Sequence, residues 1–593
     1  MFITWDQPIV MDDGLTVRAD VFRPVDGGPH PVILSYGPYG KWHHFADGSP
    51  HQWERMSSEH PETVRGSSNA YQNWEVVDPE KWVPDGYVCV RVDARGTGRS
   101  PGFFDPWSPR ETRDLYQCIE WCGEQEWSTG KVGLSGISYY AMNQWQVAAL
   151  QPPHLAAMVA WEGAADLYRD LAYHGGILCS FPDLWYQGRV LDRQHGLGRR
   201  GPKSRMTGDW VAGPETEVDE VLGAAATDLG RDFLDHPLFD EYWTERVPDL
   251  SRITVPFLSA GNWGGPGLHL RGNVEGFVRA GSDQKWLELH GLEHWTHFYT
   301  DYGVDLQKRF FGHFLKGEVT GWEDQPPVLL NIRHPGERFE FRTEDEWPLA
   351  RTRWTKLHLD GRRLTMGAVV ADETARAPYE AFGSGLTFLT DPLQEATEIT
   401  GPAACKLFVS SDTEDADIFV VLRVFTEEME EVTFQGANEP HTPVAHGWLR
   451  ASHRRLDPDL SLPYRPYHPH TEPEPLTPGV VYELDIEIWP TSIVIPAGHR
   501  IGLSVRGRDY VYPGSRPQPV ARPSTAATSG VTFTGVGPFR HNIAENRDPN
   551  IFGGTVTVHT GPEHPSYLMI PVIPEPGDGQ QEDLSMDTHD EEV

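Results

Sequence analysis

The first half of the chain alternates short apolar runs with amphipathic segments. The apolar runs cover residues 31–36, 87–92, 132–134, 156–161, 255–260 and 285–290. Residues 110–126 are amphipathic and predict a helix, and residues 306–315 predict a closing helix. Strands that alternate with helices are typical of a mostly parallel sheet with helices on both faces. Residues 7–24, two alternating strands around Asp12-Asp13-Gly14, predict an opening hairpin.

The pattern changes twice further along the chain. Between residues 166 and 249 the strand rhythm lapses, and we interpret this segment as a cap inserted into the sheet domain. After residue 326, short β-like runs recur between turns rich in Gly, Pro and Asp, which is typical of a sandwich or jelly roll. The predicted organisation is therefore an α/β domain in two parts, a cap, a jelly roll and an acidic, disordered tail. These units cover residues 1–165 and 250–325, 166–249, 326–573 and 574–593.

Composition narrows the range of partners. The 593 residues include 50 Lys+Arg and 86 Asp+Glu, a formal net charge of −36. Such a surface argues against nucleic acids and anionic membranes as partners, because both would be repelled. The amino terminus shows no signal peptide, and no apolar run approaches the length of a membrane span. Five scattered cysteines form no disulfide framework, so we expect a cytoplasmic protein. A homo-oligomer stays open.

The stretch from Lys131 to Trp145 carries the clearest chemical signal. Its apolar lead-in reads as the end of a buried strand, Gly136-Ile137-Ser138 makes a sharp turn, and helix-tolerant residues follow. A serine on such a turn is the arrangement of the nucleophile elbow, which projects the hydroxyl clear of the sheet. Position 140 is Tyr, where the commonest elbow sequence has Gly. We predict Ser138 as a nucleophile; the alternative is an ordinary serine in a strand–turn–helix unit.

Several further motifs resemble one enzyme family over nearly the whole length. They are Val21-Phe22-Arg23-Pro24, Pro38-Tyr39-Gly40-Lys41, Asp93-Ala94-Arg95-Gly96, the elbow with Asn143-Gln144-Trp145, Ala165-Asp166-Leu167-Tyr168-Arg169, Pro496-Ala497-Gly498-His499-Arg500 and Gly561-Pro562-Glu563-His564-Pro565-Ser566. The chain resembles the family of cocaine esterase, X-Pro dipeptidyl peptidase and α-amino acid ester hydrolase. The resemblance implies an α/β-hydrolase domain, a helical cap, a jelly roll and serine-hydrolase chemistry without a cofactor. It also implies an oxyanion hole made by the Tyr39 hydroxyl and the backbone N–H of Tyr139.

An activated serine needs a general base, and we expect that base in the loop after the last main strand. His290 ends this strand, and His294 lies within the loop at the position that matches the family's catalytic histidine. With His297, three histidines stand close together, so metal binding is an alternative. Their spacing matches no helix-borne zinc pattern and no carboxylate motif stands beside them, so we expect no metal.

The third member of the triad departs from the resemblance. The family places an Asp just after the strand equivalent to residues 255–260, and the matching position here is Gly264. Glu162, at the end of the neighbouring strand, is our candidate for a relocated acid that orients His294. Asp166 is the second candidate and Asn262, a neutral orienting group, the third.

These residues predict a serine hydrolase that cleaves an ester, or an amide, through an acyl-enzyme. The expected partner is a small-molecule ester or amide substrate. Within the same site, X-Pro dipeptidyl peptidase, α-amino acid ester hydrolase and acyltransferase activities stay open. Members that recognise a free ammonium need acidic groups in the pocket, and the insertion after residue 43 supplies Glu54, Glu59, Glu62 and Glu75. The missing Asp also motivates an alternative from another class, a non-catalytic binding protein on a hydrolase scaffold.

Overall fold

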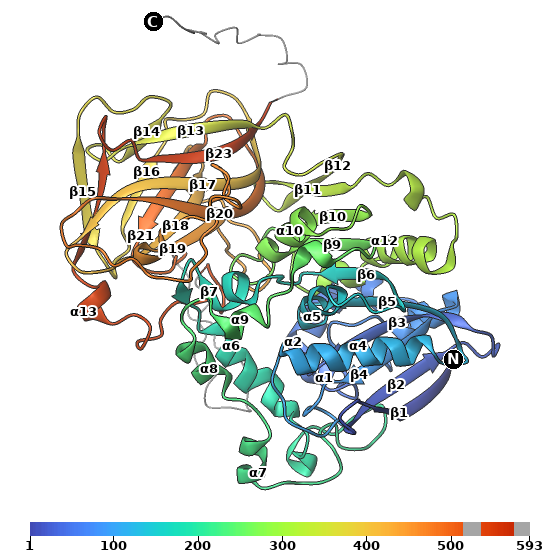
Figure 1. Cartoon of the computed structure of the whole chain (residues 1–593). Coiled ribbons are helices and arrows are strands. Elements are labelled where there is room, and N and C mark those ends of the chain that lie inside the picture. The colour runs from blue at the N-terminus through green and yellow to red at the C-terminus, as the bar shows by residue number, and fades with distance from the viewer. Residues whose placement is uncertain (514–534, 575–593) are drawn as a thin grey trace, which may run out of the picture.

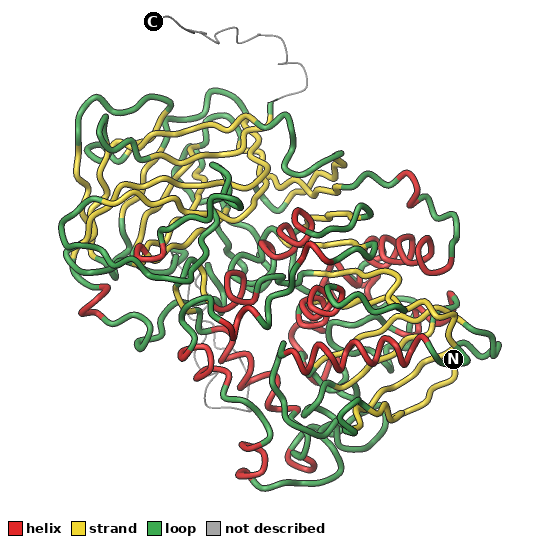
Figure 2. The backbone as a smooth tube through the Cα atoms, in the orientation of Figure 1, coloured by secondary structure: helices red, strands yellow, loops and turns green. Residues whose placement is uncertain are grey.

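The computed structural model describes residues 1–513 and 535–574. An α/β domain and a C-terminal β domain lie beside each other, and the cap helices α6 to α9 extend below their junction (Figure 1). The tube in Figure 2 shows the strands gathered in these two bodies and the helices concentrated in the first. The predicted combination of an α/β-hydrolase domain, a cap and a jelly roll is the architecture observed.

The α/β domain is built on a ten-stranded sheet with the order β1-β2-β4-β3-β5-β6-β9-β10-β11-β12. Pairing is parallel from β4 through β11 and antiparallel at both edges. The strands are β1 (Phe2–Val10), β2 (Thr16–Arg23), β3 (His30–Gly37), β4 (Val88–Asp93), β5 (Ser128–Ile137), β6 (Leu155–Trp161), β9 (Phe257–Asn262), β10 (Lys285–His290), β11 (Val328–His334) and β12 (Arg338–Glu344). The opening hairpin and the six apolar runs overlap these strands, and the runs 87–92 and 255–260 begin shortly before β4 and β9.

Both faces of the sheet are buried. Along β3, Val32 and Leu34 join one apolar core while Ile33 joins another, because successive side chains point to opposite faces. The first core includes side chains of α4 (Pro109–Gly123), α5 (Tyr139–Ala148) and α10 (Leu270–Arg279), and the second includes those of α12 (Asp301–Phe311). Shorter helices are α1 (Phe45–Gly48), α2 (Pro50–Glu59), α3 (Pro79–Trp82) and α11 (Thr296–Tyr299). A doubly covered parallel sheet gathers functional groups at the carboxyl ends of its strands.

The elements of the cap are short. Two separate helices lie between Asp219 and Asp235, because the Asp228 side chain accepts the N–H of Arg231 and starts a new helix there. The cap elements are β7 (Tyr173–His174), β8 (Ile177–Leu178), α6 (Phe181–Trp185), α7 (Asp219–Ala224), α8 (Leu229–Asp235) and α9 (Glu241–Thr244), preceded by a π-helical turn, Leu167–Ala172.

The C-terminal domain is a mostly antiparallel sheet that closes on itself, since β23 pairs with both β13 and β17. Its interior is a separate apolar core that includes Phe388, Leu422 and Ile486. The elements are β13 (Arg353–Asp360), β14 (Thr365–Gly367), β15 (Ala375–Glu380), β16 (Leu386–Leu389), β17 (Thr397–Ser411), β18 (Asp417–Phe425), β19 (Ala445–Arg450), β20 (Tyr482–Ile495), β21 (Arg500–Arg506), α13 (Pro549–Phe552), β22 (Thr555–Thr560) and β23 (Tyr567–Ile573).

One predicted boundary differs from the structure. The sequence assigns everything after residue 325 to the jelly roll, but β11 pairs in parallel with β10 and β12 completes the first sheet. The α/β sheet therefore extends to Glu344, because an apolar run does not reveal which sheet a strand will join. The predicted acidic tail, apart from residue 574, lies outside the described residues. Among the helices described, none is long and apolar enough to cross a membrane.

Candidate active site

Ser138 lies on the sharp turn between β5 and α5. Its backbone has φ 60° and ψ −116°, a strained conformation for a residue with a Cβ. Its N–H donates to the carbonyls of Trp161 at 3.1 Å and Glu162 at 3.0 Å, so the end of β6 fixes the turn. Ser138 keeps partial exposure while the side chains that follow it are buried. This is the geometry of a nucleophile elbow, with the hydroxyl presented at the carboxyl edge of the sheet.

Three glycines make room for the elbow and for Tyr140. A Cβ at Gly136 would lie 2.4 Å from Cβ of Tyr140, and one at Gly37 would lie 2.6 Å from Cε1 of its ring. A Cβ at Gly163 would lie 2.5 Å from that of Ala141. The usual elbow glycine at position 140 is therefore replaced by a buried ring whose space comes from Gly37 and Gly136.

The Ser138 hydroxyl is in contact with His269, which the sequence analysis missed. His269 Nε2 lies 3.1 Å from Ser138 Oγ, and its Nδ1 accepts the N–H of Ala164 at 3.3 Å. Since Nδ1 is an acceptor in this assignment, Nε2 carries the hydrogen of the neutral ring and donates it to Ser138. Burial, with the charge of His294 nearby, holds the pKa of His269 well below its usual range. His269 is therefore a hydrogen-bond donor to the serine in this arrangement.

A sequence signal for His269 does exist. The residue is the N-cap position of α10, in the segment that follows β9, whose carboxyl end lies at the same edge of the sheet as Ser138. Polar residues just after parallel strands are candidates for a site by position alone.

His294 is held between two buried carboxylates. Its Nδ1 lies 2.7 Å from Glu162 Oε2 and its Nε2 lies 3.0 Å from Glu75 Oε1. Burial alone would lower the pKa of His294, but the charges and hydrogen bonds of Glu162 and Glu75 outweigh it and raise the pKa to about 10. The His294 ring stacks on that of His269, with centroids 5.2 Å apart and planes at 14°. Ser138 and His294 thus share one site, and His269 contacts both.

Glu162 also binds a second histidine. His290 Nε2 lies 3.1 Å from Glu162 Oε1, and its Nδ1 lies 2.6 Å from Glu288 Oε2. Burial disfavours the charged forms of Glu162 and His290. The rings of His294 and His290 nevertheless lower the pKa of Glu162 to about 2. Glu288, together with Glu162, raises the pKa of His290 to about 9. The result is a buried chain of alternating carboxyl and imidazole groups from Glu288 through His290, Glu162 and His294 to Glu75.

The structure explains why position 264 carries no acid. A Cβ on Gly264 would lie 2.3 Å from Cα of Gly436, which belongs to a loop of the jelly-roll domain. The same loop receives the N–H of His294 on the carbonyl of Ala437 at 3.1 Å, and the Ala437 N–H donates to Gly264 at 2.8 Å. The backbone of the second domain fills the space that a side chain at position 264 would need.

The two other candidates for the third triad position differ in location. Asn262 Nδ2 lies 3.3 Å from Glu162 Oε1 and 2.9 Å from the carbonyl of Leu292, so it supports the acid and the loop. Asp166 instead caps the π-helical turn and binds Arg169 Nη1 at 2.7 Å. Asp166 therefore serves to anchor the cap.

The predicted oxyanion donors lie around the elbow. The Tyr39 ring packs edge-on against those of Tyr139 and Tyr140, with centroids 6.3 and 5.8 Å away. The Tyr39 hydroxyl accepts the indole N–H of Trp185 at 3.1 Å, which leaves its own hydrogen available. Tyr139 is the first residue of α5, where a helix supplies no acceptor for the backbone N–H. Both groups are suited to donate to an oxygen that develops charge above Ser138.

The acidic residues of the insertion separate into two groups. Glu75 reaches the site, and burial raises its pKa although His294 opposes this. Its Oε2 is buried with no hydrogen-bond partner. Glu54, Glu59 and Glu62 belong to the helical segments between Pro50 and Thr63, and Glu59 pairs there with Arg55.

Comparisons with known proteins agree with this fold. Residues 13–299 match the X-Pro dipeptidyl-peptidase (S15) family, and residues 320–569 match the X-Pro dipeptidyl-peptidase C-terminal non-catalytic domain. The crystal structure of a CocE/NonD family hydrolase from Staphylococcus aureus is 31% identical, with a TM-score of 0.81 over 96% of this chain and 94% of that chain. The chain belongs to the CocE/NonD family of hydrolases. Cocaine esterase from Rhodococcus sp. (strain MB1 Bresler) is 25% identical, covering 95% of this chain and 97% of that protein.

Another solved member of this fold is an α-amino acid ester hydrolase. It is 16% identical, covers 96% of each chain and has a TM-score of 0.64, which shows a shared fold alone. Membership of the CocE/NonD family, together with the match to the S15 peptidase family, makes this protein a serine-type hydrolase, and the alternative of a non-catalytic binding protein gives way to an enzyme.

Proposed function

We propose that this enzyme hydrolyses carboxylic esters through an acyl-enzyme formed on Ser138. The observation that carries the proposal is the strained Ser138 elbow in one site with the His294–Glu162 pair. Ser138 Oγ attacks the carbonyl carbon, while His294 takes the hydroxyl proton and passes it to the leaving alkoxide. Water then attacks the acyl-enzyme with His294 as base, which releases the acid and restores the serine hydroxyl.

Glu162 and the oxyanion donors complete this mechanism. A carboxylate on His294 Nδ1 fixes the ring orientation and stabilises the imidazolium that forms during attack. The Tyr39 hydroxyl and the Tyr139 N–H stabilise the tetrahedral oxyanion. His269 positions the Ser138 hydroxyl by donating to it.

The resting site holds His294 away from the serine. His294 Nε2 faces Glu75, and Ser138 Oγ faces His269. Before attack, the imidazole has to give up the proton shared with Glu75 and turn Nε2 toward the serine. The activity should therefore increase with pH as His294 loses this proton.

The test combines labelling and turnover. A fluorophosphonate probe should label the wild-type protein and fail to label Ser138→Ala. p-Nitrophenyl esters of increasing chain length, measured beside an aminoacyl-proline anilide, should be turned over with a preference for the esters. Wild-type protein that neither reacts with the probe nor hydrolyses any ester would contradict the proposal.

A second candidate is hydrolysis of α-amino acid esters or of peptides with a free amino terminus. Glu75 favours it, because this buried carboxylate has one oxygen without a partner beside His294. An ammonium group would supply that missing donor. A higher kcat/KM for an aminoacyl ester than for its N-acetylated form would favour this candidate, and loss of the preference in Glu75→Gln would assign it to Glu75.

A further inference from the structure

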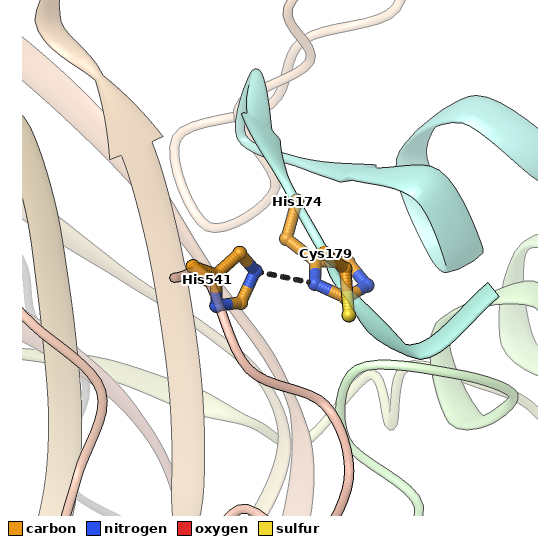
Figure 3. Close-up of side chains that lie close together, drawn as sticks. All are labelled: His174, Cys179 and His541. Atoms are coloured by element: carbon orange, nitrogen blue, oxygen red, sulfur yellow. Dashed lines mark hydrogen bonds between the residues drawn. The ribbon is translucent and has the colours of Figure 1, made fainter. Parts of the chain in front are cut away.

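Three buried side chains meet where the cap contacts the jelly-roll domain. His174 ends β7, Cys179 follows β8, and His541 comes from the C-terminal domain (Figure 3). A nitrogen of each imidazole and the sulfur of Cys179 all lie within 4.8 Å of one another. The three residues are at most 2% exposed. The sequence analysis did not connect them because they are far apart along the chain.

The hydrogen bonds around the two imidazoles leave one nitrogen of each ring facing the other. His174 Nε2 lies 3.0 Å from the carbonyl oxygen of Asp170, and His541 Nδ1 lies 2.8 Å from Asp509 Oδ1. A carbonyl oxygen and a carboxylate oxygen only accept hydrogen bonds, so His174 Nε2 and His541 Nδ1 are the donors. The other two nitrogens, His174 Nδ1 and His541 Nε2, lie 2.8 Å apart. They share one hydrogen when one ring is protonated, and both present lone pairs when both rings are neutral. A metal ion between them takes the place of that shared hydrogen.

The outer partners are those of metal-binding histidines. A coordinating imidazole commonly donates its second N–H to a carboxylate or a backbone carbonyl, which fixes the tautomer and raises the basicity of the ligand. His541 has the carboxylate and His174 has the carbonyl. Another buried pair, His453 and His470, also has nitrogens 2.9 Å apart, but the described residues bring no third ligand to it.

The donor set selects the metal class. Two imidazoles and one thiolate suit zinc, whereas magnesium and calcium prefer oxygen ligands. In a tetrahedral zinc site two coordinating nitrogens lie about 3.3 Å apart. The pair at 2.8 Å therefore needs to open by about half an ångström, and Cys179 has to lose its thiol proton. A water molecule is the fourth ligand in such a three-residue site.

We propose that His174, Cys179 and His541 form a zinc site that joins the cap to the jelly-roll domain. Two ligands come from the catalytic half of the chain and one from the other half. Because the site exists only when the two domains are docked, the free energy of zinc binding adds to the stability of the folded protein. The expected role is structural and separate from the Ser138 chemistry.

The first experiment measures zinc and its ligands on the full-length protein. After dialysis against EDTA, titration with zinc sulfate should give one tightly bound zinc per chain by elemental analysis and increase the midpoint of thermal unfolding. Cobalt(II) in place of zinc should give a thiolate-to-cobalt charge-transfer band and the visible bands of tetrahedral cobalt. Wild-type protein that takes up no stoichiometric zinc and shows no thiolate–cobalt band would overturn the proposal.

The second experiment assigns the site. Cys179→Ser and His541→Gln should weaken zinc binding by at least about 100-fold, and Asp509→Asn by about 10–100-fold. The matched controls are Cys405→Ser, a buried thiol in β17, and His453→Gln, from the other histidine pair; both should bind zinc as the wild type does. Zinc affinity that is unchanged in Cys179→Ser would refute the assignment. If a ligand variant does not fold, the cobalt spectrum of the wild type and the zinc affinity of Asp509→Asn still test the proposed site.

Discussion

Two of the buried histidine clusters among the described residues treat protons in opposite ways. In the active site, both nitrogens of His294 and both of His290 face carboxylates, and the pKa values of these rings increase to about 10 and about 9. At the junction of the cap and the jelly roll, His174 faces a carbonyl and another imidazole. Burial, helped by His541, lowers the pKa of His174 to about 3.

The comparison shows that the partners, and not burial, decide what a buried histidine does. His290 and His174 are both almost fully buried, at 0% and 1% exposure. Carboxylates on both nitrogens of His290 stabilise its protonated form. The carbonyl on one nitrogen of His174 leaves its other nitrogen to an imidazole or a metal ion. The first environment serves acid–base chemistry and the second serves coordination.

The largest expected effect separates the two stacked histidines of the active site. His294→Gln should reduce kcat by about 10⁴–10⁶, because the base that accepts the serine proton is lost. His269→Gln should reduce kcat by about 10-fold or less, because the amide can still donate to Ser138 Oγ. Steady-state kinetics on one p-nitrophenyl ester measures both. The reverse order of effects would make His269 the base.

The next effect concerns Glu162, the carboxylate that His290 and His294 share. Glu162→Gln should reduce kcat by about 10³–10⁴ by analogy with other triad acids, because the imidazolium loses its counter-charge. Asp509→Asn makes the corresponding change beside His541 and should leave kcat unchanged. Near-normal turnover of a folded Glu162→Gln protein would exclude Glu162 as the acid.

A smaller effect is expected on the pH profile. Glu75 helps to raise the pKa of His294, and the base must be unprotonated to act. Glu75→Gln should therefore lower this pKa and move the rise of kcat/KM to lower pH. Measurements from pH 5 to 10 on an uncharged ester, beside the control Glu59→Gln, test this. Superimposable profiles would mean that Glu75 does not hold the proton.

The smallest effect is on stability. His290 has a folded pKa of about 9, above the usual value of 6.5, so its contribution is fully present below about pH 6.5 and is lost as the pH increases through 9. Glu288→Gln removes one cause of this shift. The free energy of unfolding should then fall less steeply between pH 6.5 and 9, by on the order of 1–3 kcal/mol. Urea unfolding at several pH values measures the slope, and an equal slope in both proteins would contradict the prediction.

The sequence predicts the scaffold well because the fold depends on local patterns. The six apolar runs are all strands, and Ser138 occupies the expected turn. Glu162 lies next to His294 as the neighbouring-strand argument expects, since the ends of adjacent parallel strands are necessarily close.

The features that the sequence did not predict all depend on contacts between distant segments. The contact of His269 with the serine and the reach of Glu75 to His294 are set by how loops fold over the sheet edge. β11 joins the first sheet through pairing that its own sequence does not specify. The histidine–cysteine cluster requires the two domains to be docked before it exists.

The loop at Gly436 and Ala437 makes the α/β domain depend on the C-terminal domain. It accepts the backbone N–H of His294 and fills the space that a side chain at position 264 would need. A gene fragment that encodes the α/β domain alone would lack this loop. We therefore expect recombination between relatives to keep the two domains together. The C-terminal domain is in this sense part of the enzyme's smallest working unit.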